Sequence, residues 1–181
     1  LVRLYEKRVF SLTSRMCRNS ADAEEAAQEA FLAAWQALPA FRGDASFATW
    51  LYRLVSNACV DILRREGRHQ AMAGPSLDDE ESSPEPPDKS PSPHALAERA
   101  ELRRQIEAGL AALPPEYRQV LILREIHQCT YDEIAQICSI DLGTVKSRIN
   151  RGRKRLRKIL MESGNFSAAG ASKKTEKEGC R

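Results

Sequence analysis

A proline-rich acidic stretch near the middle of the chain constrains most strongly what the chain can fold into. Residues 75–93 read PSLDDEESSPEPPDKSPSP and contain six of the nine prolines, six acids and one large apolar residue. Such a segment cannot bury enough apolar surface to offset the entropy lost on ordering it. The sequence therefore predicts two modules, at 1–70 and 95–162, joined by a flexible acidic linker at 71–94, and a disordered tail at 163–181.

Both modules are predicted to be helical, which gives an all-α fold of two small domains. Apolar residues recur at helical spacings, and no alternating strand pattern of useful length occurs. Ser20 is expected to cap the second helix, and Thr130 with Glu133 has capping-box spacing. The predicted helices cover about 2–17, 20–38, 46–66 and 95–112, and further helices start near 115, 131 and 141.

Composition argues against a secreted, membrane or metal-binding protein. No uncharged apolar run approaches the length of a membrane span, and no secretory signal pattern opens the chain. The five cysteines are odd in number and scattered, which indicates a reducing, cytoplasmic compartment. His127, Cys129 and Cys138 are conceivable metal ligands, but Cys138 falls on the expected core side of a helix. We therefore expect neither a metal nor a cofactor.

Residues 130–156, TYDEIAQICSIDLGTVKSRINRGRKRL, have the pattern of a helix-turn-helix. A short helix ends at a tight break at 139–141, and a longer helix follows. Apolar residues at helical spacing are expected to face inward. They are Ile134, Ala135 and Cys138 on the first helix, and Val145, Ile149, Gly152, Leu156 and Leu160 on the second.

The other side of the second helix is suited to duplex DNA. Residues 141–158 contain eight Lys or Arg residues and one acid. In a helix-turn-helix this helix enters the major groove, where Arg, Lys, Asn and Ser meet base edges and later basic residues meet phosphates. A solvated basic face on a structural helix is the alternative. Arg148, nearer the core edge, is expected to contact a phosphate or an intramolecular partner. The residues opposite the core stripe in this motif (132–151) and in the turns after it are Ser147, Asn150, Arg151, Lys154 and Lys158.

The third helix and the loop before it favour single-stranded DNA. The loop sequence FRGDASF supplies Phe41 and Arg42, and the helix adds Trp50 beside a polar face that includes Arg53 and Asn57. Bases stack on aromatic rings while Arg holds the backbone of a single strand. Packing of the two aromatic residues on neighbouring helices is an equal alternative at this point. The core stripe expected on the same helix is Phe47, Leu51, Leu54, Val55, Ala58 and Ile62.

The second helix has a polar face with a leucine in its middle. Leu32 lies among acids and amides there, and an exposed leucine in that setting suits a protein partner. An isolated surface leucine is the simpler alternative.

Together these pieces resemble a bacterial sigma factor of the sigma-70 family, in the extracytoplasmic-function (ECF) group. The likeness is carried by DAEEAAQEAFLAAWQAL (22–38), FRGDASFATWLYRLVSNACVDILRR (41–65) and the stretch from LPPEY to RKRL (113–156). These stretches cover most of both modules, in the family's order. A helix-turn-helix alone is shared by many regulators, whereas the combination is specific.

The resemblance implies that the first module is like sigma region 2. Its segment at 25–38 would bind the clamp helices of the largest polymerase subunit. Its segment at 41–65 would melt the minus-ten promoter element and capture a flipped base. The implied core-binding residues are Glu25, Gln28, Glu29, Leu32 and Trp35. The implied minus-ten residues are Phe41, Arg42, Trp50, Asn57, Asp61 and Arg64.

The resemblance also implies that the second module is like sigma region 4, which reads the minus-thirty-five element as duplex and contacts the flap of the second-largest subunit. The implied minus-thirty-five residues are Lys146, Ser147, Arg148, Asn150, Arg151 and Lys154. The protein would be a specificity subunit, not an enzyme, and an anti-sigma factor would be a further partner. An alternative is a stand-alone helix-turn-helix regulator, but the first module lacks the α/β pattern of a receiver domain. A metal-dependent nuclease using the acids at 78–81 is another, but a linker cannot fix their geometry.

Overall fold

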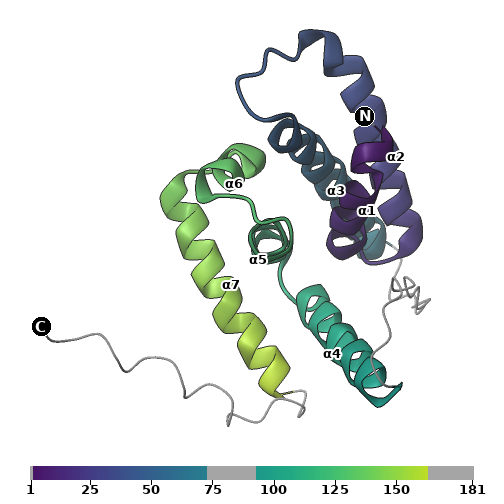
Figure 1. The fold of residues 1–181 in the computed structure, drawn as a ribbon, viewed down its shortest axis with the longest axis vertical. Coiled ribbons are helices and arrows are strands. Elements are labelled where there is room, and N and C mark those ends of the chain that lie inside the picture. The colour runs from purple at the N-terminus through teal and green to yellow at the C-terminus, as the bar shows by residue number, and fades with distance from the viewer. Residues whose placement is uncertain (1, 73–92, 163–181) are drawn as a thin grey trace, which may run out of the picture.

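The structure is a computed structural model that describes residues 2–72 and 93–162, and these residues are almost entirely helical (Figure 1). The described part contains seven α-helices, two short helical segments and no strand, so the all-α prediction is confirmed. The predicted tail and most of the predicted linker lie outside the described residues. The elements are α1 (Val2–Met16), α2 (Ser20–Ala37), η1 (Leu38–Ala40), α3 (Phe47–Met72), α4 (Pro93–Ala111), α5 (Pro115–Leu121), the π-helical η2 (Ile122–Ile126), α6 (Tyr131–Cys138) and α7 (Leu142–Glu162).

Two predicted helix ends are wrong. The cap of α2 is Asn19 rather than Ser20, because the Asn19 side-chain oxygen accepts the backbone N–H of Asp22 at 2.8 Å. Ser20 is already the first helical residue. The third helix continues past Glu66 to Met72, although its start is close to the prediction, where Ser46 Oγ accepts the N–H of Thr49 at 3.1 Å.

Helices α1, α2 and α3 pack against one another through a row of small residues. Ala23, Ala26, Ala30 and Ala34 are buried along one side of α2, and side chains this small let α3 approach closely. The predicted α3 stripe is confirmed as buried at Leu51, Val55, Ala58 and Ile62, whereas Phe47 and Leu54 are only half-buried.

The helix-turn-helix is present as predicted, in α6 and α7. The Thr130–Glu133 capping box starts α6, and Ser139 ends it in the left-handed region with φ of 53°. Asp141 then accepts the backbone N–H of Thr144 at 2.8 Å and starts α7. The buried residues are Ile134 and Ile137 on α6 and Val145, Ile149 and Gly152 on α7, while Ala135, Cys138, Leu156 and Leu160 are half-buried.

A glycine allows α7 to lie close to α5. A Cβ atom added at Gly152 would lie 3.1 Å from Leu121 Cδ1, tighter than ordinary van der Waals contact. Since α5 and α7 pack directly here, a Cβ at Gly152 would require the Leu121 side chain to move by a few tenths of an ångström.

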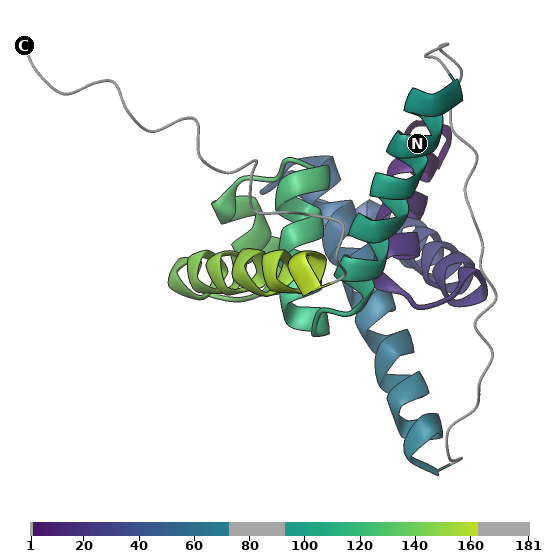
Figure 2. The same cartoon turned by 90° about the horizontal axis from the view of Figure 1, so that it is seen from below.

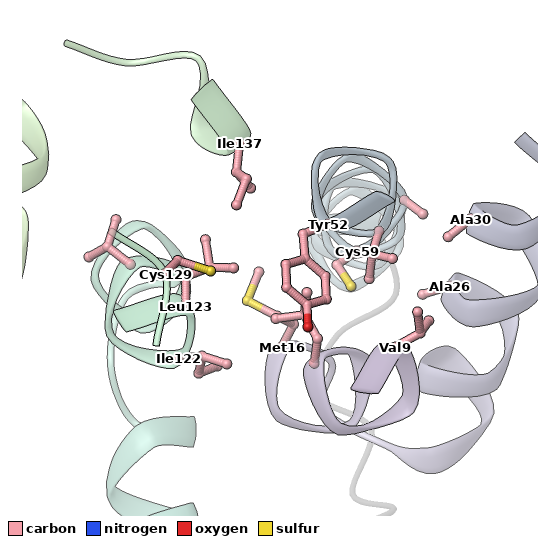
Figure 3. Close-up of a cluster of buried hydrophobic side chains, with 14 of the residues drawn as sticks. Val9, Met16, Ala26, Ala30, Tyr52, Cys59, Ile122, Leu123, Cys129 and Ile137 are labelled. Atoms are coloured by element: carbon pink, nitrogen blue, oxygen red, sulfur yellow. The ribbon is translucent and has the colours of Figure 1, made fainter. Parts of the chain in front are cut away.

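The two modules share one core instead of standing apart. Met16 and Tyr52 of the first module lie toward Leu123 and Cys129 of the second, and all four are buried (Figure 3). Figure 2 shows that α3 and α4 leave this common body in opposite directions. This packing was not predicted from the sequence.

Arg118 of α5 connects the modules from inside. It is only 4% exposed, and its guanidinium donates to the Met16 carbonyl of α1 at 2.9 Å. It also donates to the carbonyls of Ala111 and Leu113, which close the end of α4. One buried cation therefore binds three backbone carbonyls, one in the first module and two in the second.

Candidate nucleic-acid interface

The α7 helix presents an exposed basic face. Lys146, Ser147, Asn150, Arg151 and Lys154 are all exposed. Ser147 Oγ donates to the Thr144 carbonyl at 3.0 Å, and the other four have no hydrogen-bond or ion-pair partner among the described residues. Their donors are therefore free to meet a ligand.

The remaining basic residues of α7 are not all free. Arg153 binds Glu125 of η2 at 2.6 Å, and Arg155 lies over the Tyr117 ring with 4.7 Å between guanidinium carbon and ring centroid. Arg148 is half-buried near the Cys138 thiol and has no hydrogen-bond or ion-pair partner among the described residues, so its predicted phosphate or intramolecular contact stays a prediction. The basic run thus divides into free and internally held cations.

The loop before α3 forms a pocket together with the start of that helix. The rings of Phe41, Phe47 and Trp50 make a cluster with centroids 5.0–5.8 Å apart. Gly43 turns the loop with φ of 78°, a conformation that favours glycine. The resulting hollow has a volume of about 400 Å³ and is lined by residues 40–45 together with Thr49, Trp50, Arg53 and Gln136.

The predicted minus-ten residues divide between this pocket and the next turns of α3. Phe41, Arg42 and Trp50 line the pocket. Asn57, Asp61 and Arg64 are exposed farther along α3, up to about 21 Å from Trp50 at the rise of an α-helix. The Arg64 guanidinium lies 3.5 Å from the Asp61 carboxylate. Together they form one surface that follows the helix rather than a single enclosed site.

Sequence reasoning missed two lining residues. Thr49 reads as an ordinary helix position, and it is buried. Gln136 belongs to α6 of the other module, so no local pattern around the loop could have indicated it.

The outer face of α2 carries two exposed apolar side chains. Leu32 is 58% and Trp35 76% exposed, so the predicted partner-binding leucine is on the surface. The nearby acids are held by α3, because the Arg65 guanidinium binds both Glu25 and Glu29 at 3.0 Å. Gln28 is exposed beside them. Arg65 was not predicted, and it fixes the acidic part of this face in place.

His127 lies at the contact between the modules. Its Nδ1 is 3.3 Å from the Tyr52 hydroxyl. Burial, together with the positive charges of Arg15 and Arg8, lowers the pKa of His127 to about 4. Its Nε2 is buried without a hydrogen-bond partner in the described structure. The imidazole is therefore neutral at neutral pH and incompletely paired.

The three residues considered as metal ligands do not form a metal site. In residues 2–72 and 93–162 no group of three or more His, Cys, Asp or Glu is arranged to hold an ion. Burial raises the pKa of Cys129 to about 11 and that of Cys138 to about 12, so both thiols are protonated at neutral pH. The acids at 78–81 lie outside the described residues.

Comparison with known proteins matches both modules to one family. Residues 1–69 match the family described as Sigma-70 region 2, and residues 103–156 match Sigma-70, region 4. The chain is also 37% identical over 155 residues to the ECF RNA polymerase sigma-E factor of Escherichia coli, covering 84% of this chain and 81% of that protein. This chain belongs to the sigma-70 family, in the ECF group.

Two other relatives of this sigma factor are also named as sigma factors. It is 36% identical over 169 residues to the RNA polymerase sigma-H factor of Pseudomonas aeruginosa, covering 88% of this chain and 84% of that protein. It is 34% identical over 171 residues to the ECF RNA polymerase sigma factor SigE of Mycolicibacterium smegmatis. That match covers 94% of this chain, and the chain spans 64% of the length of SigE.

Solved structures share the fold of this sigma factor. The sigma factor RpoE of Bartonella quintana, in complex with the anti-sigma factor NepR, has a TM-score of 0.72 at 21% identity and covers 88% of this chain and 94% of its own. CnrH, in complex with the cytosolic domain of CnrY, has a TM-score of 0.62 at 24% identity, and the match covers 89% of this chain and 85% of CnrH. Within the described residues of this sigma factor, no helix has the length and apolar character needed to cross a bilayer.

Proposed function

We propose that this sigma factor binds the RNA polymerase core and directs initiation by reading one promoter element as duplex and capturing another as single strand. One observation carries this proposal: a single chain has two exposed surfaces, each suited to a different form of DNA. One is the basic face of α7, and the other is the aromatic pocket before α3. Its relatives are sigma factors, which are specificity subunits rather than enzymes.

The second module, 95–162, reads the minus-thirty-five element. The free donors of Lys146, Asn150 and Arg151 meet base edges in the major groove, and Lys154 contacts a phosphate. Support comes from their exposure and from the absence of competing partners in the described structure. Ser147 and Arg148 complete the set, with Arg148 nearest the protein.

The first module, 1–70, opens and holds the minus-ten element. Extruding a base costs a few kcal/mol, and stacking on aromatic side chains returns about 1–3 kcal/mol per base. Phe41 and Trp50 supply the rings and Arg42 supplies a cation at the pocket. Asn57, Asp61 and Arg64 continue the contact along α3. Melting is then driven by binding, because only the opened strand gains these contacts.

The protein partners are assigned to other surfaces. The exposed pair Leu32 and Trp35, with the fixed acids beside them, binds the clamp helices of the largest polymerase subunit. The second module contacts the flap of the second-largest subunit, and the linker at 71–94 connects the two. An anti-sigma factor is a further partner, as NepR is for one of the solved structures.

Transcription in vitro with core polymerase on a randomised promoter library tests this function. We expect initiation from promoters that share two short elements, and loss of initiation with Leu32→Glu combined with Trp35→Glu. Leu4→Glu, at an apolar position of α1 that is 74% exposed, is the matched surface control. Failure to initiate from any sequence, together with failure to retain core polymerase in a pull-down, would instead favour a stand-alone regulator.

A further inference from the structure

A polar hollow lies at the contact between the modules. Its volume is about 400 Å³, within the range of about 300–1,000 Å³ that is typical of small-molecule sites. It shares no lining residue with the pocket before α3 or with the basic face of α7. Its walls come from α1 and α3 of the first module and from the end of η2 in the second. A ligand in this hollow would therefore touch both modules.

The lining of the hollow is rich in hydrogen-bond donors and contains no acid. Six of its seven lining residues carry a side-chain donor, namely Lys7, Arg8, Ser11, Tyr52, His127 and Gln128. The seventh is Ile126. Ser11 Oγ already accepts from the Arg15 guanidinium at 2.8 Å, so the Ser11 hydroxyl can donate to another acceptor. A lining of this kind suits an anion with several acceptor oxygens.

The charges around the hollow are mainly positive. Lys7 and Arg8 are exposed on α1, and the charges that act on the His127 ring are those of Arg8 and Arg15. Glu107 of α4 offsets part of this charge, because it pairs with Arg15 at 3.4 Å. Lys7 and Arg8 have no acidic partner among the described residues. The hollow therefore attracts anions.

His127 contributes a polar atom that has no partner. Its Nδ1 is 3.3 Å from the hydroxyl of Tyr52, a residue that lies between the modules (Figure 3). Its Nε2 is buried without a hydrogen-bond partner among the described residues. When Tyr52 donates to Nδ1, the neutral ring carries its proton on Nε2, which then acts as a donor. An unpaired buried donor destabilises the fold, so a ligand oxygen that reaches it is favoured.

The backbone on both sides of His127 is unusual. The η2 segment before it is π-helical, and π-helical turns often occur at functional sites. Gln128 after it has φ of 55°, in the left-handed region that favours glycine at a helix end. Glycine would adopt this conformation more easily, whereas glutamine keeps an amide donor at the hollow.

We propose that this hollow binds a small phosphorylated compound, whose phosphate group is held by Lys7 and Arg8 and meets His127 through one oxygen. A phosphate group has three terminal oxygens and can accept from all three side chains at once, which a carboxylate with two oxygens does less well. The hollow is larger than a phosphate group, so it has room for the rest of the compound. The DNA backbone offers the same chemistry, but the separation of the hollow from both proposed DNA surfaces favours a free compound.

Nuclear magnetic resonance on the full-length chain tests the site, with inorganic phosphate and pyrophosphate as probes. The histidine ring signals are followed at pH 7.5, and chloride keeps the ionic strength constant because salt screens non-specific attraction. The chain has three histidines, and His127→Gln identifies the signal of His127. We expect that signal to shift and saturate with pyrophosphate. The thermal unfolding midpoint should rise with the probe concentration, since the probe binds the folded chain.

Substitutions in α1 test the assigned cations. Lys7→Gln and Arg8→Gln each remove one charge at an exposed position, so the fold is retained. We expect each to weaken pyrophosphate binding about tenfold, the usual effect of losing a hydrogen bond to a charged group. Arg3→Gln is the matched control, because it removes the same charge from an exposed position of α1 outside the hollow. Its affinity should stay within about twofold of the parent chain.

Three results would overturn the inference. The first is a His127 shift no larger with pyrophosphate than with chloride at equal ionic strength, and the second is an equal loss of affinity in Arg3→Gln and Arg8→Gln. The third is displacement of pyrophosphate by a short DNA duplex at equal phosphate concentration, which would assign the hollow to backbone phosphates. Initiation is measured separately. A chain that initiates without binding pyrophosphate keeps its proposed function, and a chain that binds pyrophosphate without initiating keeps this site.

Discussion

At the scale of single residues, Arg118 shows how a charge can be buried inside a small helical protein. Its guanidinium meets carbonyls of Met16, Ala111 and Leu113, so its burial is compensated by three charged hydrogen bonds. Its Nε has no partner within the described residues, so the compensation is incomplete. The planar, forked geometry of arginine is what allows one side chain to serve carbonyls from two modules.

Arg118→Lys tests this role. The substitution keeps the charge, but a single ammonium group cannot reach all three carbonyls at once. We expect the free energy of unfolding to fall by about 2–3 kcal/mol, because at least one buried acceptor loses its donor. Urea unfolding followed by circular dichroism measures it. Arg104→Ala is the control, since the exposed Arg104–Glu101 pair is worth at most about 1 kcal/mol.

Arg151→Ala tests the reading face. If Arg151 contacts a base, affinity for the preferred minus-thirty-five duplex falls by about 1–3 kcal/mol and specificity relaxes at one position. Lys154→Ala should weaken all duplexes alike and reduce the salt slope by about 1. Arg153→Ala is the comparison, because Glu125 already holds that guanidinium. Equal losses on every sequence for Arg151→Ala would show that Arg151 binds a phosphate.

At the scale of elements, the capping box of α6 has two functions. Glu133 accepts the Thr130 N–H at 2.7 Å, and it also accepts the Thr49 hydroxyl from the other module. These hydrogen bonds lower the pKa of Glu133 from its ordinary value. Because the pKa of Glu133 is lower in the folded chain than its ordinary value of 4.5, the ionised carboxylate stabilises the fold above pH 4.5. This stabilisation is lost as the pH falls from 4.5 through the folded pKa.

Thr130→Ala should therefore destabilise α6. Loss of the cap costs about 1 kcal/mol, within a usual range of about 0.5–2 kcal/mol. The urea midpoint of the full chain at pH 7 measures the loss. Ser14→Ala is the control, because Ser14 is exposed within α1 and its side chain contacts only the Ser11 carbonyl in the described structure. A change of similar size in Ser14→Ala would remove the specific role of the cap.

Local patterns predicted most elements and their inner faces. Apolar spacing identified the buried side of α3 at Leu51 and Val55, and capping-box spacing identified the start of α6. The errors were local too. Asn19 and Ser20 are both good caps, and spacing alone chose the wrong one. The end of α3 was missed because the last turns, after Glu66, are polar and lack an apolar stripe.

Contacts between elements far apart in sequence could not be predicted. Arg118 lies in a segment that reads as an amphipathic helix, and its acceptor at Met16 is 102 residues away. Gln136 reads as a solvent-facing position of α6, yet it lines a pocket of the other module. Contacts between the modules produce no repeating pattern of apolar residues in either sequence segment. They can therefore be recognised only in the folded structure.

At the scale of the whole molecule, we expect His127 to make the packing of the two modules against each other sensitive to acid. The packed arrangement lowers the pKa of His127 from 6.5 to about 4, because the ring is buried and faces the cations Arg8 and Arg15, with Lys7 nearby and the neutral Tyr52 on the other side. Protonation therefore favours the separated state. The contact between the modules is therefore most stable above pH 6.5, and it becomes less stable as the pH falls from 6.5 toward 4.

Small-angle X-ray scattering can follow this change. We expect the radius of gyration of the full chain to increase between pH 7.5 and pH 5, while its helical circular dichroism is retained. His127→Gln should remove most of the increase, since glutamine does not titrate. An equal expansion in the glutamine variant would assign the effect to carboxylates such as Glu107, which binds Arg15 across the modules.

The buried contact between the modules also determines what can reverse it. Both halves belong to one chain, and 20 residues separate the end of α3 from the start of α4. A connection of 20 residues can span at most about 70 Å. The effective concentration of one module near the other is therefore on the order of millimolar. Dilution of the protein therefore leaves the fraction of chains with packed modules unchanged. A ligand opens the chain only by binding the separated modules more tightly than the packed ones, as a large rigid enzyme surface that engages both can do.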